Sequence, residues 1–152
     1  MKTWIQRVSK AWVKVGGEDV GRIGAGMVMF LGVRCGDTAA EVEAIAQKAL
    51  ALRIFDDADG RMNRSILDAG GSVLVVSQFT LYADTRHGSR PSWSLAARGD
   101  EAQPLYEAMI ARLRETLGEA RVQCGRFGAE MEVGVINDGP VSVELLKERD
   151  GI

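Results

Sequence analysis

The chain has 152 residues, of which 46% are hydrophobic, and its formal net charge at pH 7 is −2. This length and apolar content are typical of one globular domain with a buried core, so we expect residues 1–152 to form a single domain. The slight negative charge argues against a general nucleic-acid binder, because such proteins present strongly basic surfaces.

Two features of the sequence bear on the cellular compartment. Polar side chains are scattered through Met1 to Arg7, where a secretory signal needs an unbroken apolar segment. The longest apolar run, residues 27–33, is too short to cross a bilayer and fits a buried strand. Cys35 and Cys124 lack metal-binding or C-x-x-C spacing, which favours two buried thiols in a reducing compartment, with a disulfide as the alternative. We therefore expect a cytoplasmic protein with no membrane contact.

Three strands are predicted at the start of the chain. In an extended strand over residues 3–15 the side chains would point alternately to two faces, and apolar groups occur on both. Gly16-Gly17 is typical of a hairpin turn into residues 18–23. Residues 24–26 then lead into a buried strand at 27–34. We expect these three strands to be arranged as a meander.

Hydrophobic spacing predicts two helices. Asp37 or Thr38 can cap a helix that runs to about residue 52, with apolar residues recurring opposite a charged face. A second helix is predicted over residues 101–117, capped by Asp100. Its apolar stripe is expected to belong to the core and comprises Leu105, Met109, Leu113 and Leu117.

The remaining segments are read as strands and loops. A turn-rich loop at residues 56–60 precedes an apolar run that predicts a buried strand over residues 72–78. Residues 82–99 are expected to be irregular. Three more strands are predicted near the end of the chain, and a Gly-Pro turn joins the last two: residues 121–124, 130–136 and 141–146. This order predicts an α+β fold in which a mostly antiparallel sheet curls into a barrel-like core with two covering helices.

Two short segments carry the candidate chemistry. Ser77-Gln78-Phe79-Thr80-Leu81 follows the buried strand, so its hydroxyl and amide groups are presented where that strand leaves the core. Asn137-Asp138-Gly139-Pro140-Val141-Ser142 combines the free backbone of glycine with the fixed φ of proline. Only an X-Pro bond becomes cis at modest cost. We expect the two segments to form one active site.

The sequence lacks several common catalytic groups. The one histidine, His87, would have to serve any Ser-His-Asp or Cys-His mechanism, and we expect instead an exposed loop residue that meets phosphate. One histidine and two distant cysteines make a poor zinc site, so no metal and no cofactor is predicted. Hydroxyl, amide and main-chain groups still stabilise an oxyanion, each donor contributing about 3 to 4 kcal/mol.

Positive charge gathers at two places along the chain. Lys2, Arg7, Lys10 and Lys14 precede the first acidic residue, and the interval between Asp84 and Asp100 is free of acids but holds Arg86, Arg90 and Arg98. Either set is a candidate for phosphate contact, and an ordinary solvated surface is the alternative for each.

With these segments the chain resembles the D-aminoacyl-tRNA deacylases of the D-tyrosyl-tRNA deacylase type, which clear tRNA mischarged with D-amino acids. Further shared motifs extend the resemblance over nearly the whole chain: Ile5-Gln6-Arg7-Val8, Leu31-Gly32-Val33, Leu52-Arg53-Ile54-Phe55, Met62-Asn63, Gly88-Ser89-Arg90-Pro91-Ser92 and Gly128-Ala129-Glu130-Met131. Two positions depart from the family pattern, Ser142, where threonine is common, and Trp93, where phenylalanine is frequent.

The resemblance implies hydrolysis of the ester of D-aminoacyl-tRNA, and of glycyl-tRNA mischarged on non-cognate tRNA, by a barrel-like homodimer. The residues implied to line the catalytic pocket are Ser77, Gln78, Phe79 and Thr80. The N–H groups of Phe79 and Thr80 would face the ester carbonyl, and Gln78 would bond the terminal nucleotide. The nucleophile is either Thr80 or, as the missing base favours, water assisted by a ribose hydroxyl of the substrate.

The resemblance also implies how the chiral centre is recognised. The turn at Gly139 and Pro140, with a cis peptide bond, would enter the partner's site and exclude L side chains, while Arg7 holds that turn. A surface position is the alternative for Arg7. Contacts with the tRNA acceptor end are expected from the cationic loop, namely from Arg86, His87 and Arg90. The alternative functions are a barrel that binds RNA or aminoacyl ligands without turnover, and a hydrolase of small esters with a threonine nucleophile.

Overall fold

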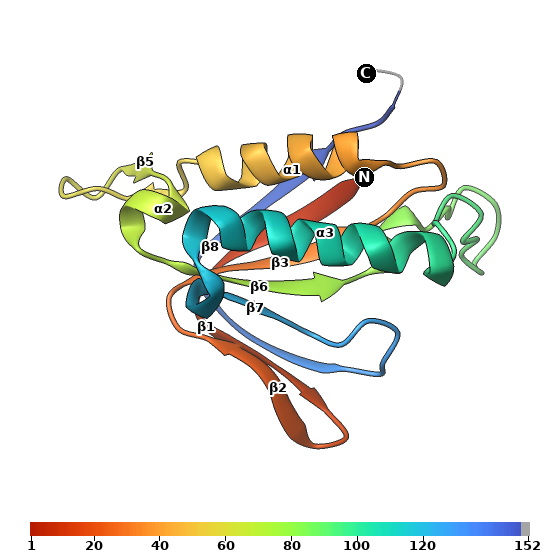
Figure 1. Cartoon of the computed structure of the whole chain (residues 1–152), viewed down its shortest axis with the longest axis horizontal. Helices are drawn as coiled ribbons and strands as arrows, with labels where there is room; N and C mark the ends of the chain where they lie inside the picture. The colour runs from red at the N-terminus through yellow and green to blue at the C-terminus, as the bar shows by residue number, and fades with distance from the viewer. Residues whose placement is uncertain (150–152) are drawn as a thin grey trace.

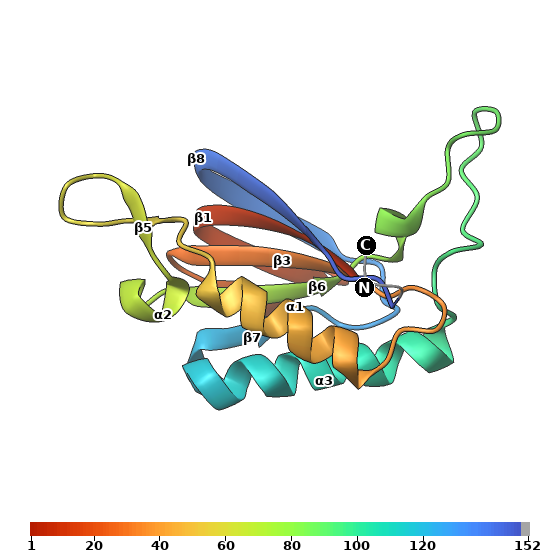
Figure 2. The ribbon, with the colours of Figure 1, turned by 90° about the horizontal axis from the view of Figure 1, so that it is seen from above.

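The computed structural model describes residues 1–149, which form a curled sheet with helices packed on one of its faces (Figures 1 and 2). The elements, with η marking 3₁₀ turns, are β1 (Lys2–Val15), β2 (Glu18–Ile23), β3 (Gly26–Gly32), α1 (Ala39–Ala51), β4 (Phe55–Asp56), β5 (Met62–Arg64), α2 (Ile66–Ala69), β6 (Ser72–Ser77), η1 (Phe79–Tyr82), α3 (Gly99–Leu117), η2 (Glu119–Arg121), β7 (Val122–Cys124) and β8 (Glu132–Leu146). The predicted strands and the two long helices are confirmed, except that the last two strands are one.

Strand β1 organises the sheet because it is long enough to pair with three others. On one edge β8 runs antiparallel to it from Lys2↔Leu146 to Lys14↔Glu132. The other edge is shared, with β3 beside residues 2–8 and β2 beside residues 11–15, and the register of one continues into that of the other. The predicted meander order is therefore wrong: β3 follows β2 along the same edge of β1 and does not pair with it.

The rest of the sheet is parallel. Strand β3 pairs with β6, and β6 pairs with β7, both in parallel. Parallel neighbours need crossover connections, and α1 and α3 lie in those connections. Both helices consequently cover the same face (Figure 2). The α+β class, the barrel-like curl and the two covering helices are confirmed, with the sheet mixed and with α2 as a short additional helix.

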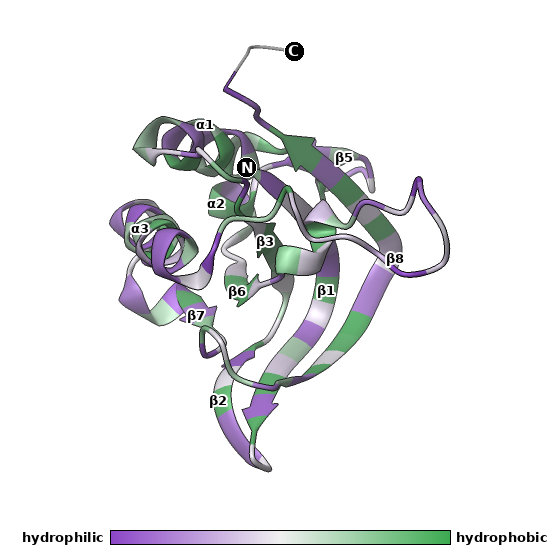
Figure 3. Ribbon diagram, turned by 90° about the vertical axis from the view of Figure 1, so that its right-hand side faces the viewer, coloured by the Kyte–Doolittle hydropathy of each residue, from purple (hydrophilic) through white to green (hydrophobic). Residues whose placement is uncertain are grey.

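Strands β3 and β6 are buried on both faces. Figure 3 shows them between the helices on one side and the curved strands β1 and β8 on the other. Met27 and Met29 belong to the core under the helices, whereas Val28, Leu74 and Val76 belong to a second core inside the curl of the sheet. This double burial explains why the two strands read as continuous apolar runs.

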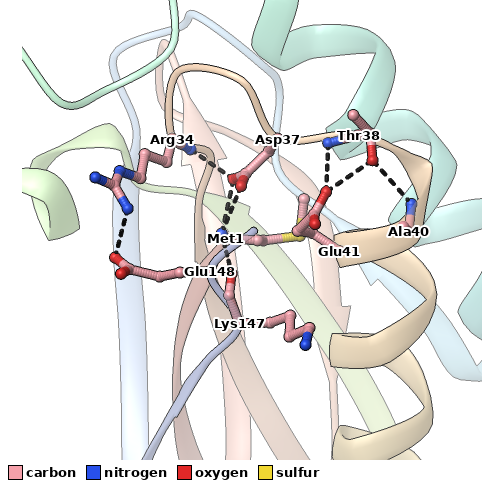
Figure 4. Close-up of polar contacts among 8 residues, drawn as sticks. All are labelled: Met1, Arg34, Asp37, Thr38, Ala40, Glu41, Lys147 and Glu148. Atoms are coloured by element: carbon pink, nitrogen blue, oxygen red, sulfur yellow. Dashed lines mark hydrogen bonds and ion pairs between the residues drawn. The ribbon is translucent and has the colours of Figure 1, made fainter. Parts of the chain in front are cut away.

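Helix α1 begins with a capping box. The Thr38 side chain accepts a hydrogen bond from the backbone, and the Glu41 carboxylate accepts bonds from the Thr38 N–H at 2.7 Å and hydroxyl at 2.8 Å (Figure 4). Just before it, Asp37 accepts a 2.7 Å bond from the N–H of Arg34 and a 2.8 Å bond from the amino group of Met1. Thr38 is therefore the cap, and Asp37 ties the helix start to β1.

Helix α3 begins two residues before the position predicted. Its first residue is Gly99, its cap position is Arg98, and no side chain caps it. Asp100 lies inside the first turn, where a carboxylate interacts favourably with the helix dipole without capping. The expected core stripe is buried at Met109, Leu113 and Leu117 and half-buried at Leu105.

Both cysteines are free thiols, but only Cys124 is partly buried. Cys35 is exposed, contrary to the prediction, because β3 has already ended at Gly32. Its Sγ donates to the carbonyl oxygen of Ala96 at 3.2 Å. Within residues 1–149, no helix is both long and apolar enough to span a bilayer.

Candidate active site

A cavity of 560 Å³, hereafter the pocket, opens where β6 ends. Ser77, Gln78 and Phe79 line one side of it. The opposite side comes from α3 and from the segment before β8, including Tyr106 and Phe127. Three of the four residues expected to line the pocket therefore do so. Thr80 does not: it is half-buried in η1 and is not among the residues that line the pocket.

The backbone at the pocket offers two hydrogen-bond donors. Phe79 and Thr80 open the 3₁₀ turn η1, and the first N–H groups of such a turn have no partner inside it. Within the described part of the chain, neither N–H donates to another backbone carbonyl, while the neighbouring N–H groups of Gln78 and Leu81 do. Two adjacent N–H groups are thus free to bind an acceptor, as an oxyanion hole requires.

The Thr80 hydroxyl contacts an amide side chain. Gln78 Nε2 donates a hydrogen bond to Thr80 Oγ1. An amide does not accept a proton near neutral pH, so this neighbour orients the hydroxyl without activating it. The geometry gives Thr80 no general base among its hydrogen-bond partners in residues 1–149.

The second segment, Asn137 to Ser142, has a different shape from the one predicted. Strand β8 is continuous, with Gln6 opposite Ser142 and Val8 opposite Asn137, so four residues of β8 oppose Arg7 alone. Residues 138–141 are therefore a bulge in one strand, hereafter the Gly-Pro bulge, and the predicted turn between two strands is wrong. The Gly139-Pro140 peptide bond is cis. Because the bulge leaves the β1–β8 ladder, its main chain is available to other contacts.

Arg7 fastens the Gly-Pro bulge to the loop after α1. Its Nε donates to the carbonyl oxygen of Asp138 at 3.0 Å, and its Nη1 donates to the carbonyl oxygen of Ile54 at 2.8 Å. Nη1 also lies 3.3 Å from Oδ1 of Asp56 in β4. Arg7 is only 7% exposed, which contradicts the surface-residue alternative.

Gly139 is a position that only glycine fits well. Its φ is +129°, and a Cβ placed there would lie 2.9 Å from the backbone nitrogen of Val141 and 3.4 Å from Arg7 Nη2. The first of these distances is shorter than van der Waals contact permits. The bulge therefore keeps its close main-chain packing only with glycine.

The Gly-Pro bulge and the pocket lie apart within one chain. The bulge is opposite Arg7, whereas Ser77 is level with Thr3 through its pairing with Leu31. This offset is four residues along the strands, about 13 Å, and three strand spacings across them, about 14 Å. In Figure 1 the bend of β8 accordingly lies well to the left of the end of β6. The two segments expected to form one active site do not meet in a single chain.

Residues 83–98 form an arm that extends away from the body (Figure 2). Arg86 donates to the Asp84 carboxylate through Nε at 2.9 Å and Nη2 at 2.7 Å. These bonds lower the pKa of Asp84 to about 2. They also engage the guanidinium of Arg86 in an ion pair. His87 and Arg90 are exposed farther along the arm and have no ion pair among the described residues.

Two residues of the pocket escaped the sequence analysis. Tyr106 donates hydrogen bonds from its hydroxyl to the carbonyl oxygen of Val75 at 3.1 Å and of Gly125 at 3.4 Å, which fixes the pocket wall to β6. Burial raises the pKa of that hydroxyl. Phe127 packs against the Tyr106 ring at 5.6 Å between centroids. Their sequence signals were weak, since Tyr106 lies beside the predicted helix stripe and Phe127 precedes the Gly128-Ala129 motif.

The sequence profile of a family described as D-Tyr-tRNA(Tyr) deacylase matches residues 4–146. The chain belongs to this family. A D-aminoacyl-tRNA deacylase of Roseiflexus castenholzii is 55% identical over 145 residues, which cover 95% of this chain and 91% of the relative. The identity therefore extends over almost the whole of both proteins.

Two solved structures share the fold of this chain. One described as c-Myc DNA Unwinding Element Binding Protein superposes with a TM-score of 0.93 at 39% identity, covering 97% of this chain and 99% of the other. A probable eukaryotic D-amino acid tRNA deacylase superposes with a TM-score of 0.83 at 16% identity, covering 95% and 97%, and shows the shared fold.

Proposed function

We propose that this deacylase-family chain hydrolyses the ester bond of D-aminoacyl-tRNA, releasing the D-amino acid and free tRNA. The observation that supports this proposal is a pair of backbone N–H groups beside the pocket, those of Phe79 and Thr80, which donate no hydrogen bond to a backbone carbonyl. An aminoacyl ester is already an activated acyl group, so donors that stabilise its oxyanion suffice without a strong protein nucleophile. The names of the relatives supply the substrate class.

The nucleophile in this mechanism is water assisted by the neighbouring ribose hydroxyl of the substrate. The Thr80 hydroxyl is hydrogen-bonded to the Gln78 amide and lacks a base, which opposes a covalent acyl-threonine. The protein supplies orientation and oxyanion contacts, with Ser77 and Gln78 on the pocket wall beside the terminal nucleotide. Trapping an acyl-Thr80 adduct would contradict this route.

The complete site is formed by two chains. The Gly-Pro bulge of one subunit enters the pocket of the other, which accounts for the distance between bulge and pocket in a single chain. A bulge that leaves its own ladder and is braced by Arg7 is suited to reach a second molecule. The homodimer is therefore part of the proposal.

Chiral selection is steric in this scheme. Main-chain atoms of Gly139 and Pro140 lie against the L side of the substrate Cα and leave room for hydrogen but not for a methyl group. A clash of about 4 kcal/mol gives close to thousandfold selectivity. Glycine carries hydrogen on both sides, so glycyl-tRNA is also a substrate.

The experiment that tests this proposal follows deacylation of matched D-tyrosyl-, L-tyrosyl- and glycyl-tRNA by the purified protein. Rapid loss of the D-tyrosyl and glycyl esters, with the L-tyrosyl ester stable, is the expected result. Stability of all three with a folded dimer would overturn the enzymatic function. If D-tyrosyl-tRNA were hydrolysed but glycyl-tRNA were as stable as L-tyrosyl-tRNA, the result would support the hydrolytic activity and contradict the steric explanation of chiral selection.

A further inference from the structure

Two large aromatic rings beside the pocket have no part in the mechanism above. Phe79 and Trp93 meet edge to face with their ring centroids 5.2 Å apart. Both remain well exposed, Phe79 at 55% and Trp93 at 41%. Single exposed apolar side chains are ordinary, but two aromatic rings in contact at the mouth of a cavity form a surface suited to a flat apolar ligand.

The position of this aromatic pair relates it to the pocket and to the arm. Phe79 lines the pocket and begins η1, whereas Trp93 belongs to the arm at residues 83–98. A ligand that extends out of the pocket past Phe79 therefore meets the Trp93 ring. The mechanism uses only the main-chain N–H of Phe79, so its ring is available for this contact.

The arm that carries Trp93 is rich in positive charge. No acidic residue occurs between Asp84 and Asp100, and the arm between them carries arginines. Arg86 is paired with Asp84, but Arg90 has no ion pair among residues 1–149. Exposed aromatic rings together with a cationic arm match a single-stranded nucleic acid, whose bases stack while its phosphates contact the cations.

We propose that Phe79 and Trp93 form a stacking platform for an unpaired nucleobase of the tRNA 3′ end, outside the pocket that takes the terminal aminoacyl-nucleoside. The inference rests on the proposed function and adds a second nucleotide subsite to it. The tRNA acceptor ends in unpaired nucleotides, so a base is available at this place. Stacking on aromatic side chains tolerates any base, which suits a platform serving many tRNAs.

The decisive experiment compares substrates with and without the preceding nucleotides. We expect Trp93→Ala to raise KM for D-tyrosyl-tRNA about tenfold and to leave KM for 3′-O-D-tyrosyl-adenosine within about twofold of wild type. Trp93→Phe keeps an aromatic face, so we expect its KM for both substrates to stay near the wild-type values. Leu95→Ala removes an exposed apolar side chain from the same arm and serves as the matched control.

Three results would overturn the platform. The first is an equal rise in KM on both substrates, and the second is no rise on either. The third is a rise in KM accompanied by dissociation of the dimer in sedimentation, which would assign Trp93 to the subunit interface. A binding assay with the trinucleotide CCA and with adenosine, neither carrying an amino acid, separates this inference from the proposed function. A Trp93→Ala defect confined to CCA supports the platform even if no hydrolysis is found, and equal CCA binding by wild type and Trp93→Ala contradicts it.

Discussion

The Nε–H of Arg7 donates a 3.0 Å hydrogen bond to the main-chain carbonyl of Asp138, the residue that precedes Gly139. The bond joins residues at opposite ends of the sequence and makes a buried arginine the support of the Gly-Pro bulge. Since the same guanidinium also binds the Ile54 carbonyl, it fixes the bulge relative to a second segment of the chain. The position of the bulge therefore depends on Arg7.

Replacing Arg7 with alanine should relax the discrimination between D and L substrates. The bulge loses its support, so we expect the ratio of D-tyrosyl- to L-tyrosyl-tRNA deacylation rates to fall at least tenfold. The free energy of unfolding should fall by about 1 to 3 kcal/mol because two carbonyl groups lose their partner. Arg22→Ala, which removes an exposed arginine of β2, is the control. Unchanged discrimination in a folded Arg7→Ala protein would contradict the supporting role.

Gly139→Ala should damage the bulge more than a glycine substitution elsewhere. Its Cβ would meet the Val141 nitrogen at 2.9 Å, whereas Gly60, also at positive φ, has no atom within 4 Å of the same position. Gly139 has φ +129° and Gly60 has φ +75°, so alanine is strained at both positions, and only at Gly139 does it also clash. We expect Gly139→Ala alone to alter selectivity in the deacylation assay. Equal effects of the two variants on selectivity would contradict the specific role of the Gly-Pro bulge.

Mixed dimers test whether pocket and bulge come from different subunits. Phe79→Pro removes one oxyanion donor at the first residue of η1, a helical position that commonly accepts proline, and should lower kcat by about 10²- to 10³-fold. A heterodimer of Phe79→Pro with Gly139→Ala contains one intact pocket facing one intact bulge. We expect it to hydrolyse D-tyrosyl-tRNA with wild-type selectivity, measured after purification through two different tags. Selectivity as poor as that of the Gly139→Ala homodimer would assign the bulge to its own pocket.

Arg90 should contribute more to tRNA binding than Arg86. Arg86 is held by Asp84, whereas Arg90 has no ion pair among the described residues. Each phosphate contact with a single-stranded nucleic acid adds about 0.7 to the magnitude of the slope of log K against log salt concentration. We expect Arg90→Ala to reduce that magnitude by about 0.7 and Arg86→Ala to change it little. Equal reductions by both variants would mean that the Asp84 pair opens on binding.

The capping box of α1 should make stability depend on pH. Hydrogen bonds from the Thr38 hydroxyl and N–H hold the pKa of Glu41 below its ordinary value of 4.5. The carboxylate therefore stabilises the fold above pH 4.5 and loses this effect as the pH falls through the lower, folded pKa. Glu41→Gln should lower the free energy of unfolding by about 1 kcal/mol at pH 7 and by progressively less toward pH 3, measured by urea unfolding. Exposed Glu18→Gln is the control, and a cost independent of pH would contradict the prediction.

The sequence by itself determined the elements and the residues of interest. Apolar runs and helical spacing depend on local burial, so both long helices and the strands of the large sheet are predicted within two residues of their ends, except that β8 is divided into two. Thr38 is among the predicted caps. The segments at Ser77 and Gly139 were identified because turn chemistry and polar groups after a buried run are also local signals.

Only the tertiary structure decided how these parts meet. Strand pairing joins residues far apart in sequence, so local patterns did not show that β2 and β3 share one edge of β1, or that β6 and β7 run parallel to β3. The same long-range pairing made the Gly-Pro segment a bulge opposite Arg7, buried that arginine and separated the bulge from the pocket. The physical reason is that a strand edge accepts any partner that completes its hydrogen bonds, and the choice is made by the packing of the whole chain.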